Sequence, residues 1–397
     1  MSHRPLRAAC LAAVLLLAAP GPGAHAEPGA PAAPGAPVAP AAPGENVGVL
    51  LTRLQGLYQK AEEASEAYNA TEEALKTRQD EEKRLSAELG RARSAVGSQK
   101  ALLGRLAREQ YQGSRSGFSP YARMLLAKNP RAALEQRRLA AREGARRAGM
   151  LHRLARGEKQ ADALATRARE ALDDQQSLAA QQKRHKEEVG LRLKEVERVL
   201  ASLTAEQLTR LGAREAEDTA AAQRKLVDSG RLPTRTGTPT AAGGAALTYA
   251  AAQIGKPYVW GAEGPGAFDC SGLTSQAWAH AGRSIPRTSQ EQWAQLPKVP
   301  LDQLRPGDLV VYFPKATHVA LYVGQGKVIQ APRPGAKVKV SPLAANPLLG
   351  AVRPDPAGTP LAEFTPPPLP EPDTTGADDT GYSSEEAPES EAETSAR

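Results

Sequence analysis

The sequence predicts a long helical rod followed by a compact domain that contains both helices and an antiparallel strand pair. Apolar residues recur at alternating three- and four-residue spacing through much of the first half of the chain, which is typical of a coiled coil. All three tryptophans fall between Trp260 and Trp293, and such aromatic bulk is what a globular core needs and a rod lacks. We therefore expect the compact domain in the C-terminal part.

The N-terminal residues 1–26 read as a secretory signal. Arg4 and Arg7 give a positive start, Leu11 to Ala19 form an apolar stretch, and Ala24-His25-Ala26 provides small residues at a cleavage site. No later segment approaches the roughly 18 to 20 uninterrupted apolar residues of a membrane span. We expect a secreted protein, extracellular or associated with the cell wall.

Residues 27–44 are almost all Pro, Ala and Gly, and we expect an extended spacer. Residues 45–228 are expected to form the rod, whose first helix would be roughly 85 Å long at ~1.5 Å per residue. Its predicted seam comprises Leu54, Leu57, Ala61, Ala64, Tyr68, Leu75, Leu85, Leu89, Ala92, Val96, Leu103 and Leu106. Asn129-Pro130 is expected to start a second helical run, with weak breaks at three glycines, that extends to about Asp228. An antiparallel intramolecular pair is the simplest arrangement, and a parallel intermolecular coil is the alternative.

A Gly-, Thr- and Pro-containing linker is expected at 229–243, the compact domain at 244–354, and a disordered acidic, Pro-rich tail at 355–397. The whole chain has a formal charge of +7, but residues 27–356 alone carry +14 because the tail is acidic. Such a body attracts polyanions. In an exported protein, anionic wall polymers or lipid headgroups fit better than nucleic acid, for which no motif is present, although a solvated surface without a partner is an equal alternative.

Cys270 is the only cysteine that remains once the signal, with Cys10, is removed. Asp269 is expected to cap a helix from Cys270 to about His280, stopped by Gly282. The first turn of a helix favours a thiolate and supplies backbone N–H groups that can hold an oxyanion. A nucleophile is therefore favoured over a buried structural cysteine.

The candidate base for this nucleophile is His318, at the start of an apolar run that reads as a buried strand. His280 lies ten residues along the same helix as Cys270, about 15 Å away, and cannot reach the thiol. If residues 324–326 form a three-residue hairpin loop, Gln330 pairs with Ala320 and its side-chain oxygen can accept the imidazole N–H. A two-residue loop would turn Gln330 to the opposite face.

Five segments in this part resemble the NlpC/p60 family of cell-wall cysteine peptidases, over roughly residues 244–354. They are Pro257-Tyr258-Val259-Trp260-Gly261, Phe268-Asp269-Cys270-Ser271-Gly272-Leu273, Pro286-Arg287-Thr288-Ser289-Gln290, Pro306-Gly307-Asp308-Leu309-Val310 and His318-Val319-Ala320-Leu321-Tyr322-Val323-Gly324. The resemblance implies an α+β class and a papain-like fold, in which a helix carrying the nucleophile packs on an antiparallel sheet carrying the base.

The resemblance also implies residue roles. Cys270 is the nucleophile, His318 the base and Gln330 the third member, a position where the family more often has His. The expected substrate-binding residues are Tyr258, Asp269, Ser271, Arg287 and Ser289. Asp269 has the alternative role of a helix cap only, and Arg287 that of a structural ion-pair partner.

The implied activity is thiol acyl transfer to water on peptidoglycan stem peptides, typically between D-isoglutamate and the following diamino acid. No metal or other cofactor is expected. The chain also resembles RipA-like division-associated hydrolases, which suggests that the rod restrains or positions the hydrolase or docks on a membrane division complex. The alternatives are a passive spacer, a non-catalytic scaffold that activates another wall hydrolase, and acyl transfer to an amine.

Overall fold

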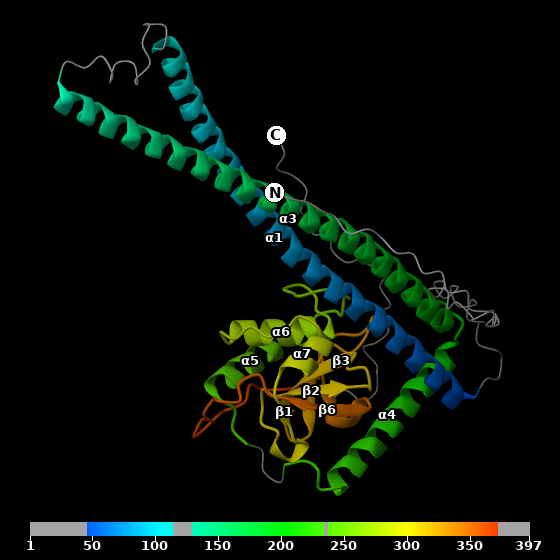
Figure 1. The fold of residues 1–397 in the computed structure, drawn as a ribbon. Coiled ribbons are helices and arrows are strands. Elements are labelled where there is room, and N and C mark those ends of the chain that lie inside the picture. The colour runs from blue at the N-terminus through cyan, green and yellow to red at the C-terminus, as the bar shows by residue number, and fades with distance from the viewer. Residues whose placement is uncertain (1–45, 114–128, 234–236, 372–397) are drawn as a thin grey trace, which may run out of the picture. The chain divides into compact units, whose positions relative to one another are not determined.

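The computed structural model describes residues 46–113, 129–233 and 237–371 (Figure 1). The predicted signal at 1–26, the predicted spacer at 27–44 and most of the predicted tail lie outside them.

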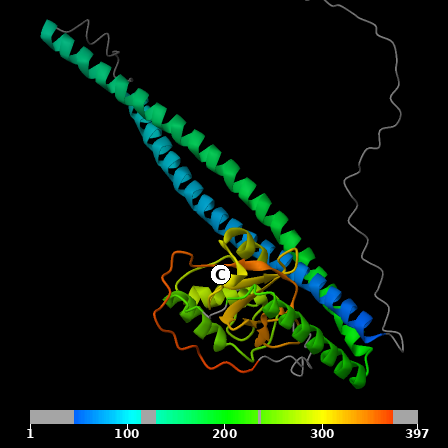
Figure 2. The same cartoon turned by 90° about the horizontal axis from the view of Figure 1, so that it is seen from below.

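Two long helices, α1 (Val47–Gly113) and α3 (Pro130–Ala201), run antiparallel side by side (Figures 1 and 2). This is the simpler of the two predicted arrangements. Asn129 caps α3 by accepting the N–H of Arg131, with Pro130 in the first turn as predicted. Part of the seam is a small apolar cluster of Leu85, Leu164 and Ala171. The predicted weak breaks at Gly144, Gly149 and Gly157 are wrong, because α3 continues through all three glycines.

The second helical run stops before Asp228, the end that was predicted for it. It ends at Ala201, and a separate helix, α4 (Ala205–Asp228), begins at a capping box in which Thr204 and Gln207 satisfy each other's backbone N–H groups. The side chain of Gln223 on α4 donates to Gly326 O and accepts from Ala344 N. Helix α4 therefore packs on the C-terminal domain.

The C-terminal domain is built on a six-stranded antiparallel sheet in the order β1-β6-β2-β3-β4-β5. The strands are β1 (Lys298–Val299), β2 (Leu309–Tyr312), β3 (His318–Gly324), β4 (Lys327–Gln330), β5 (Lys339–Pro342) and β6 (Leu348–Val352). Three helices belong to the domain: α5 (Ala241–Ala251), α6 (Cys270–His280) and α7 (Ser289–Gln295). The predicted α+β class is confirmed.

The two faces of the sheet bury different partners because side chains alternate along each strand. Leu321 and Ile329 join the main core with Leu273 and Trp278 of α6. Tyr322, on the other face of β3, joins a second cluster that includes Leu226 of α4. The nucleophile helix is therefore fixed against the strands β3 and β4 that carry the candidate base and its partner.

The chain after Val352 stays packed on the domain for longer than the sequence analysis predicts. Asp355 forms a buried ion pair with Arg305, and the ring of Phe364 lies against Gly244. Leu369 contacts the main core as well. The predicted disordered tail thus starts too early at 355, since prolines in this segment form extended chain without preventing burial of the apolar residues between them.

Candidate active site

Helix α6 places Cys270 at its first position, as predicted from the Asp269 cap. The Asp269 side chain accepts the N–H of Gly272 at 2.6 Å. Gly272 is required here because a Cβ at this position would lie 2.3 Å from Ala262 O. The thiol of Cys270 is buried, with 3% of the residue exposed, and the backbone N–H of Val319 on β3 points at the sulfur. The nucleophile helix and the strand of His318 therefore meet at the sulfur atom.

The β3–β4 hairpin joins His318 to Gln330, with 2.7 Å between Nε2 and Oε1. Because Gln330 Oε1 is an acceptor, Nε2 carries the proton and Nδ1 is left as the basic nitrogen. The turn itself has two residues, Gln325 and Gly326, both left-handed, but a bulge between Tyr322 and Gly324 compensates for the shorter turn. The register continues with Leu321 opposite Ile329. The prediction that His318 and Gln330 lie on the same face is confirmed, although the turn between their strands differs from the predicted one.

Helix α1 inserts a glutamate, Glu66, directly beside the nucleophile. Its Oε1 accepts from the Ser271 hydroxyl at 2.8 Å and lies 3.8 Å from Cys270 Sγ. Its Oε2 accepts the backbone N–H of Ser289 at 2.8 Å. Burial and the nearby Asp269 carboxylate raise the pKa of Glu66 to about 7, against the opposing effects of Arg287 and these hydrogen bonds.

One helical turn earlier, Glu62 faces the candidate base. Its Oε1 lies 3.3 Å from His318 Nδ1, an ionic contact that lacks hydrogen-bond geometry, and both side chains are buried. Burial acts to lower the pKa of His318, but the attraction of Glu62 and the hydrogen bonds outweigh it, so that the pKa is raised. Two glutamates four residues apart on α1 therefore contact His318 and Cys270, the candidate base and the candidate nucleophile.

Arg287 binds the residues on either side of Cys270. Its guanidinium donates to both carboxylate oxygens of Asp269, at 3.1 and 2.7 Å, and to the Ser271 hydroxyl at 2.8 Å. It also pairs with Glu263 at 2.9 Å. Asp269 is thus both a helix cap and an ion-pair partner, and the structure brings Asp269, Ser271, Arg287 and Ser289 together around the thiol.

The remaining predicted site residue, Tyr258, is buried, and burial followed by the proximity of Cys270 raises the pKa of its phenol well above the usual value. Close to it in the chain, Trp260 meets Tyr68 of α1 edge to face at 5.0 Å between ring centres. Helix α1 therefore also covers the Tyr258 side of the site.

Glu66, Asp269 and Cys270 each offer a ligand atom within 4.8 Å of the others. They do not fit a metal cage, because both oxygens of Asp269 already accept from Arg287 and a cation there would lie beside that guanidinium. The cluster is better described as the contact between the helix glutamate and the nucleophile.

The sequence predicts a readily ionised thiol, but this is wrong for the structure, in which α1 lies over Cys270; this arrangement is called the closed state below. Burial, then the carboxylates of Glu66, Asp269 and Glu62, raises the pKa of Cys270 well above its usual value. The helix N-terminus does favour the thiolate, but three acidic side chains and the loss of solvent outweigh it. The contacts of α1 therefore disfavour the thiolate form of Cys270, the candidate nucleophile.

The roles of Glu62 and Glu66 were missed by sequence reasoning, which assigned the neighbouring Ala61, Ala64 and Tyr68 to the coiled-coil seam. Ala64 and Tyr68 join a cluster that contains Val189 and Leu193 of α3 and also the core of the C-terminal domain. A signal was present: nine acidic residues against six basic ones in 47–89, within a body that is otherwise strongly basic. The spacing of Glu62, Glu66 and Asn69 also places them on one face of the helix.

The structure defines an α+β domain in which Cys270 begins a helix against strand β3, the strand whose His318 contacts Gln330. Residues 255–349 match the model of the NlpC/P60 family, and the chain carries a domain of this family. A probable endopeptidase of Corynebacterium glutamicum is 47% identical over 122 residues, which are 30% of this chain and 58% of that protein. A probable endopeptidase of Mycobacterium tuberculosis is 37% identical over 119 residues, 29% of this chain and 31% of that protein. The chain thus spans less than two thirds of these relatives.

Solved structures are also similar to part of this chain, and two of them are as follows. The NlpC/p60 domain of the peptidoglycan hydrolase SagA is 36% identical, with 28% of this chain and 97% of that one covered and a TM-score of 0.27. The NlpC/p60 domain of RipD from Mycobacterium tuberculosis, described as non-catalytic and adapted to peptidoglycan binding, is 34% identical, with 28% and 96% covered and a TM-score of 0.26.

The contact between Gln330 and His318 makes a testable prediction. In Gln330→Ala the imidazole loses a hydrogen bond worth about 1 kcal/mol. Because that bond helps to raise the pKa of His318, the variant is expected to have a lower His318 pKa. NMR titration of the labelled histidine rings measures it, with Gln325→Ala in the exposed turn as the control. An unchanged His318 titration in Gln330→Ala would mean that Gln330 does not hold the ring.

Proposed function

We propose that this protein is a secreted peptidoglycan hydrolase that cleaves stem-peptide bonds, between D-isoglutamate and the following diamino acid, by Cys-His thiol acyl transfer. The observation that carries the proposal is the convergence of α6 and the β3–β4 hairpin at one buried sulfur, with His318 oriented by Gln330. The NlpC/P60 domain and the relatives named probable endopeptidases support a peptidase. In the part of the chain that the structure describes, no helix is long and apolar enough to cross a membrane.

The proposed reaction begins when His318 Nδ1 takes the proton of the Cys270 thiol. The thiolate attacks the carbonyl carbon of the stem peptide, and backbone N–H groups at the start of α6 hold the oxyanion. The C–N bond then breaks, and the imidazolium returns its proton to the leaving amine. Water, deprotonated by His318, attacks the thioester and releases the acyl product with a free carboxylate. No added oxidant, metal or cofactor is needed for this balance.

The partners of Glu66 support a glutamyl substrate. A carboxylate is held here by the Ser271 hydroxyl and the Ser289 N–H, 3.8 Å from the nucleophile, with Arg287 behind the hydroxyl. D-isoglutamate has a free α-carboxylate close to the bond that is to be cut. We infer that this carboxylate takes the place of Glu66 when substrate binds. Ser271, Arg287 and Ser289 are then substrate-binding residues, and Tyr258 and Asp269 line the same groove.

Substrate and α1 compete for one groove in this proposal, so the rod restrains the hydrolase. Glu62 contacts His318, the proposed base, and Glu66 fills the proposed carboxylate site. The side-chain amide of Asn69 donates to Asp269 at 3.0 Å. Withdrawal of α1 would also remove burial, Glu66 and Glu62, which are causes of the raised thiol pKa. The same movement would therefore open the groove and lower the pKa of the Cys270 thiol.

The closed arrangement is incompletely satisfied, which supports reversible closure. Among the described residues, Glu62 Oε2, Ser65 Oγ and Asn69 Oδ1 on α1 are buried without a hydrogen-bond partner, as is His318 Nδ1. Each such group costs about 1–3 kcal/mol relative to hydration. A modest competing interaction elsewhere on the rod would therefore suffice to release it.

Replacement of the two glutamates is expected to activate the enzyme. Glu62→Ala combined with Glu66→Ala removes the contacts to base and nucleophile, and we expect hydrolysis of purified peptidoglycan to rise at least about tenfold, the equivalent of about 1.4 kcal/mol. Mass analysis of released muropeptides should show new amino termini on the diamino acid. Asp80→Ala combined with Glu88→Ala, two acidic residues elsewhere on α1, is the matched control and should leave the rate unchanged.

Addition of Cys270→Ala to the activated variant should abolish these products. Identical products with and without Cys270 would contradict the proposal that this protein is a hydrolase and would favour the non-catalytic scaffold. Equal rates for the wild type and the Glu62, Glu66 double variant would leave hydrolysis intact and eliminate the restraint. Amide products in the presence of added amines, in place of free carboxylates, would assign acyl transfer instead.

The closed state is expected to weaken as pH rises through about 7. Glu66 has a pKa of about 7 when closed, against 4.5 as the ordinary value, so closure takes up a proton and becomes less favourable as pH rises between these values. His318 also has a raised pKa when closed, so its pairing with Glu62 contributes below its ordinary value and is lost at higher pH. Both groups act in the same direction.

The measurement is the hydrolysis rate of the wild type divided by that of the Glu62, Glu66 double variant, from pH 5.5 to 8. The ratio cancels the pH dependence of the chemistry itself and is expected to rise with pH. A ratio that is flat or falls over this range contradicts the assignment of closure to these two carboxylates.

A further inference from the structure

The charges of the helical hairpin are segregated along its length. Residues 90–113 of α1 and 130–160 of α3, here called the distal hairpin, hold fourteen Lys and Arg against four Glu. The remainder of α1, residues 47–89, holds six basic and nine acidic residues. Helix α1 contacts the catalytic domain through this acidic part, for example through Glu63, which pairs with Lys315. The basic excess therefore has no role in closing the active site.

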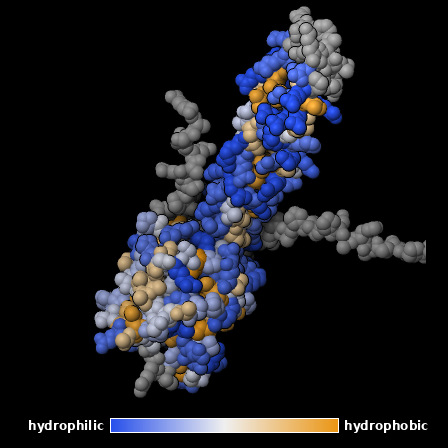
Figure 3. Space-filling view, turned by 60° about the vertical axis from the view of Figure 1, so that its left-hand side comes forward, coloured by the Kyte–Doolittle hydropathy of each residue, from blue (hydrophilic) through white to orange (hydrophobic). Residues whose placement is uncertain are grey.

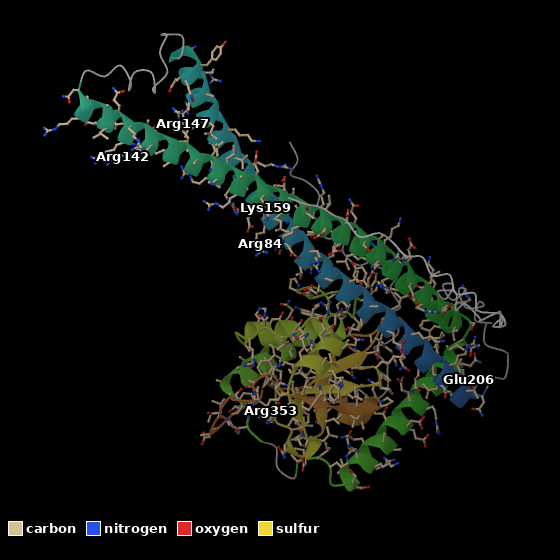
Figure 4. All side chains as sticks on the ribbon, viewed as in Figure 1. Arg84, Arg142, Arg147, Lys159, Glu206 and Arg353 are labelled. Atoms are coloured by element: carbon tan, nitrogen blue, oxygen red, sulfur yellow. The ribbon has the colours of Figure 1, made fainter. Side chains whose placement is uncertain are left out.

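The basic side chains of the distal hairpin are mostly free to bind a partner. Of the fourteen, only Lys100 and Arg147 form ion pairs among the described residues, with Glu158 and Glu143. Figure 4 shows Arg142 and Arg147 along this part of α3, away from the labelled Arg353 of the catalytic domain. Twelve of the fourteen are arginines, whose planar guanidinium binds phosphate oxygens in pairs. Over 31 residues of α3, the array is about 46 Å long at 1.5 Å per residue.

Large apolar side chains are exposed among these arginines. Leu134, Leu139 and Leu151 are each 58% exposed, Tyr111 is 75% exposed and Leu102 is 42% exposed. Figure 3 shows orange side chains within the mainly blue surface towards this end of the rod. A soluble polyanion would be bound by the arginines alone, because it has no apolar region in which the leucine side chains could be buried. A bilayer interface accepts both, since Leu and Tyr enter the headgroup boundary while Arg side chains reach the phosphates.

We propose that the distal hairpin is a docking surface for an anionic lipid bilayer. The hairpin lies on the bilayer through Arg and exposed Leu side chains and does not cross it. Each basic residue near an anionic surface strengthens binding about fivefold at low salt, so an array of this size is sufficient for stable docking. The proposal is independent of the hydrolase and of the chemistry at Cys270.

The test is vesicle co-sedimentation of the chain starting at Glu27, which keeps every described residue and removes the apolar stretch of the predicted signal. Vesicles of phosphatidylcholine alone are compared with vesicles containing 30% phosphatidylglycerol. We expect binding to the anionic vesicles only, and a steep loss of binding between 50 and 500 mM salt. Linear polyphosphate is the soluble polyanion used as a competitor and as a separate ligand.

Two sets of variants locate the surface. Arg138→Glu, Arg142→Glu and Arg153→Glu together are expected to weaken vesicle binding more than about 100-fold. Lys183→Glu, Arg184→Glu and Lys186→Glu make the same change in net charge on an exposed part of α3 outside the distal hairpin, and should have less than one tenth of that effect. Circular dichroism confirms that both sets keep their helices.

A third pair separates lipid from other polyanions. Leu134→Ser with Leu139→Ser should weaken vesicle binding at least about tenfold and leave polyphosphate binding unchanged, whereas Leu172→Ser with Leu191→Ser, also exposed, should change neither. Equal losses for the two charge-reversal sets would overturn the proposal, because binding would then follow net charge alone. Binding to polyphosphate without binding to anionic vesicles, or vesicle binding that ignores the leucines, would replace the bilayer by a soluble polyanion.

Discussion

The seating of Glu62 and Glu66 against His318 and Cys270 is the contact on which the properties of this molecule depend. It joins residues more than 200 positions apart in the sequence and links the rod to the candidate active site. Buried carboxylates are expensive unless they are paired and hydrogen-bonded. The burial cost of Glu66 is offset by hydrogen bonds from Ser271 and Ser289 and by the neighbouring Arg287. Glu62 contacts only the imidazole of His318, and its Oε2 has no hydrogen-bond partner. This incomplete compensation supports the proposal that the contact is reversible.

This contact also explains why the pKa of Cys270, the candidate nucleophile, is raised and not lowered. A helix N-terminus and a nearby histidine normally lower the pKa of a thiol. In the closed state Cys270 is surrounded by carboxylates and excluded from water, so that its pKa rises instead. The same residues that bind a glutamyl carboxylate in the proposed reaction bind the glutamate of α1. The proposed restraint needs no separate inhibitory domain, because the Glu66 carboxylate resembles that of the proposed glutamyl substrate.

The sequence was sufficient for the features that local chemistry determines. The Asp269 cap and the strand at His318 follow from spacing and residue type, and the structure contains both. Gln330 faces His318 as predicted, although the turn that was assumed for it is wrong. The turn differed because a bulge, which depends on twist and packing, compensated for a shorter loop. The sequence does contain the capping box of Thr204 and Gln207, but the helix start was missed because the surrounding Ala-rich pattern is continuous.

The rod's contact with the active site could not be derived in the same way. Heptad periodicity specifies which face of a helix is buried but not against what, and Ala64 and Tyr68 satisfy a coiled-coil seam as well as they satisfy the catalytic core. Pairing Glu66 with Ser289 requires the tertiary path of the chain, because no local rule connects two segments more than 200 residues apart. The missed thiol pKa is a consequence of that missed contact.

The most direct test of this account is the alkylation rate of Cys270 by iodoacetamide in the wild type and in the Glu62→Ala, Glu66→Ala variant. Intact mass gives an unambiguous reading, since no other cysteine lies beyond residue 26. We predict slow labelling of the wild type at pH 7 and labelling at least about tenfold faster in the variant, because both exposure and ionisation of the thiol increase. Rapid and equal labelling of the two proteins would contradict the closed site.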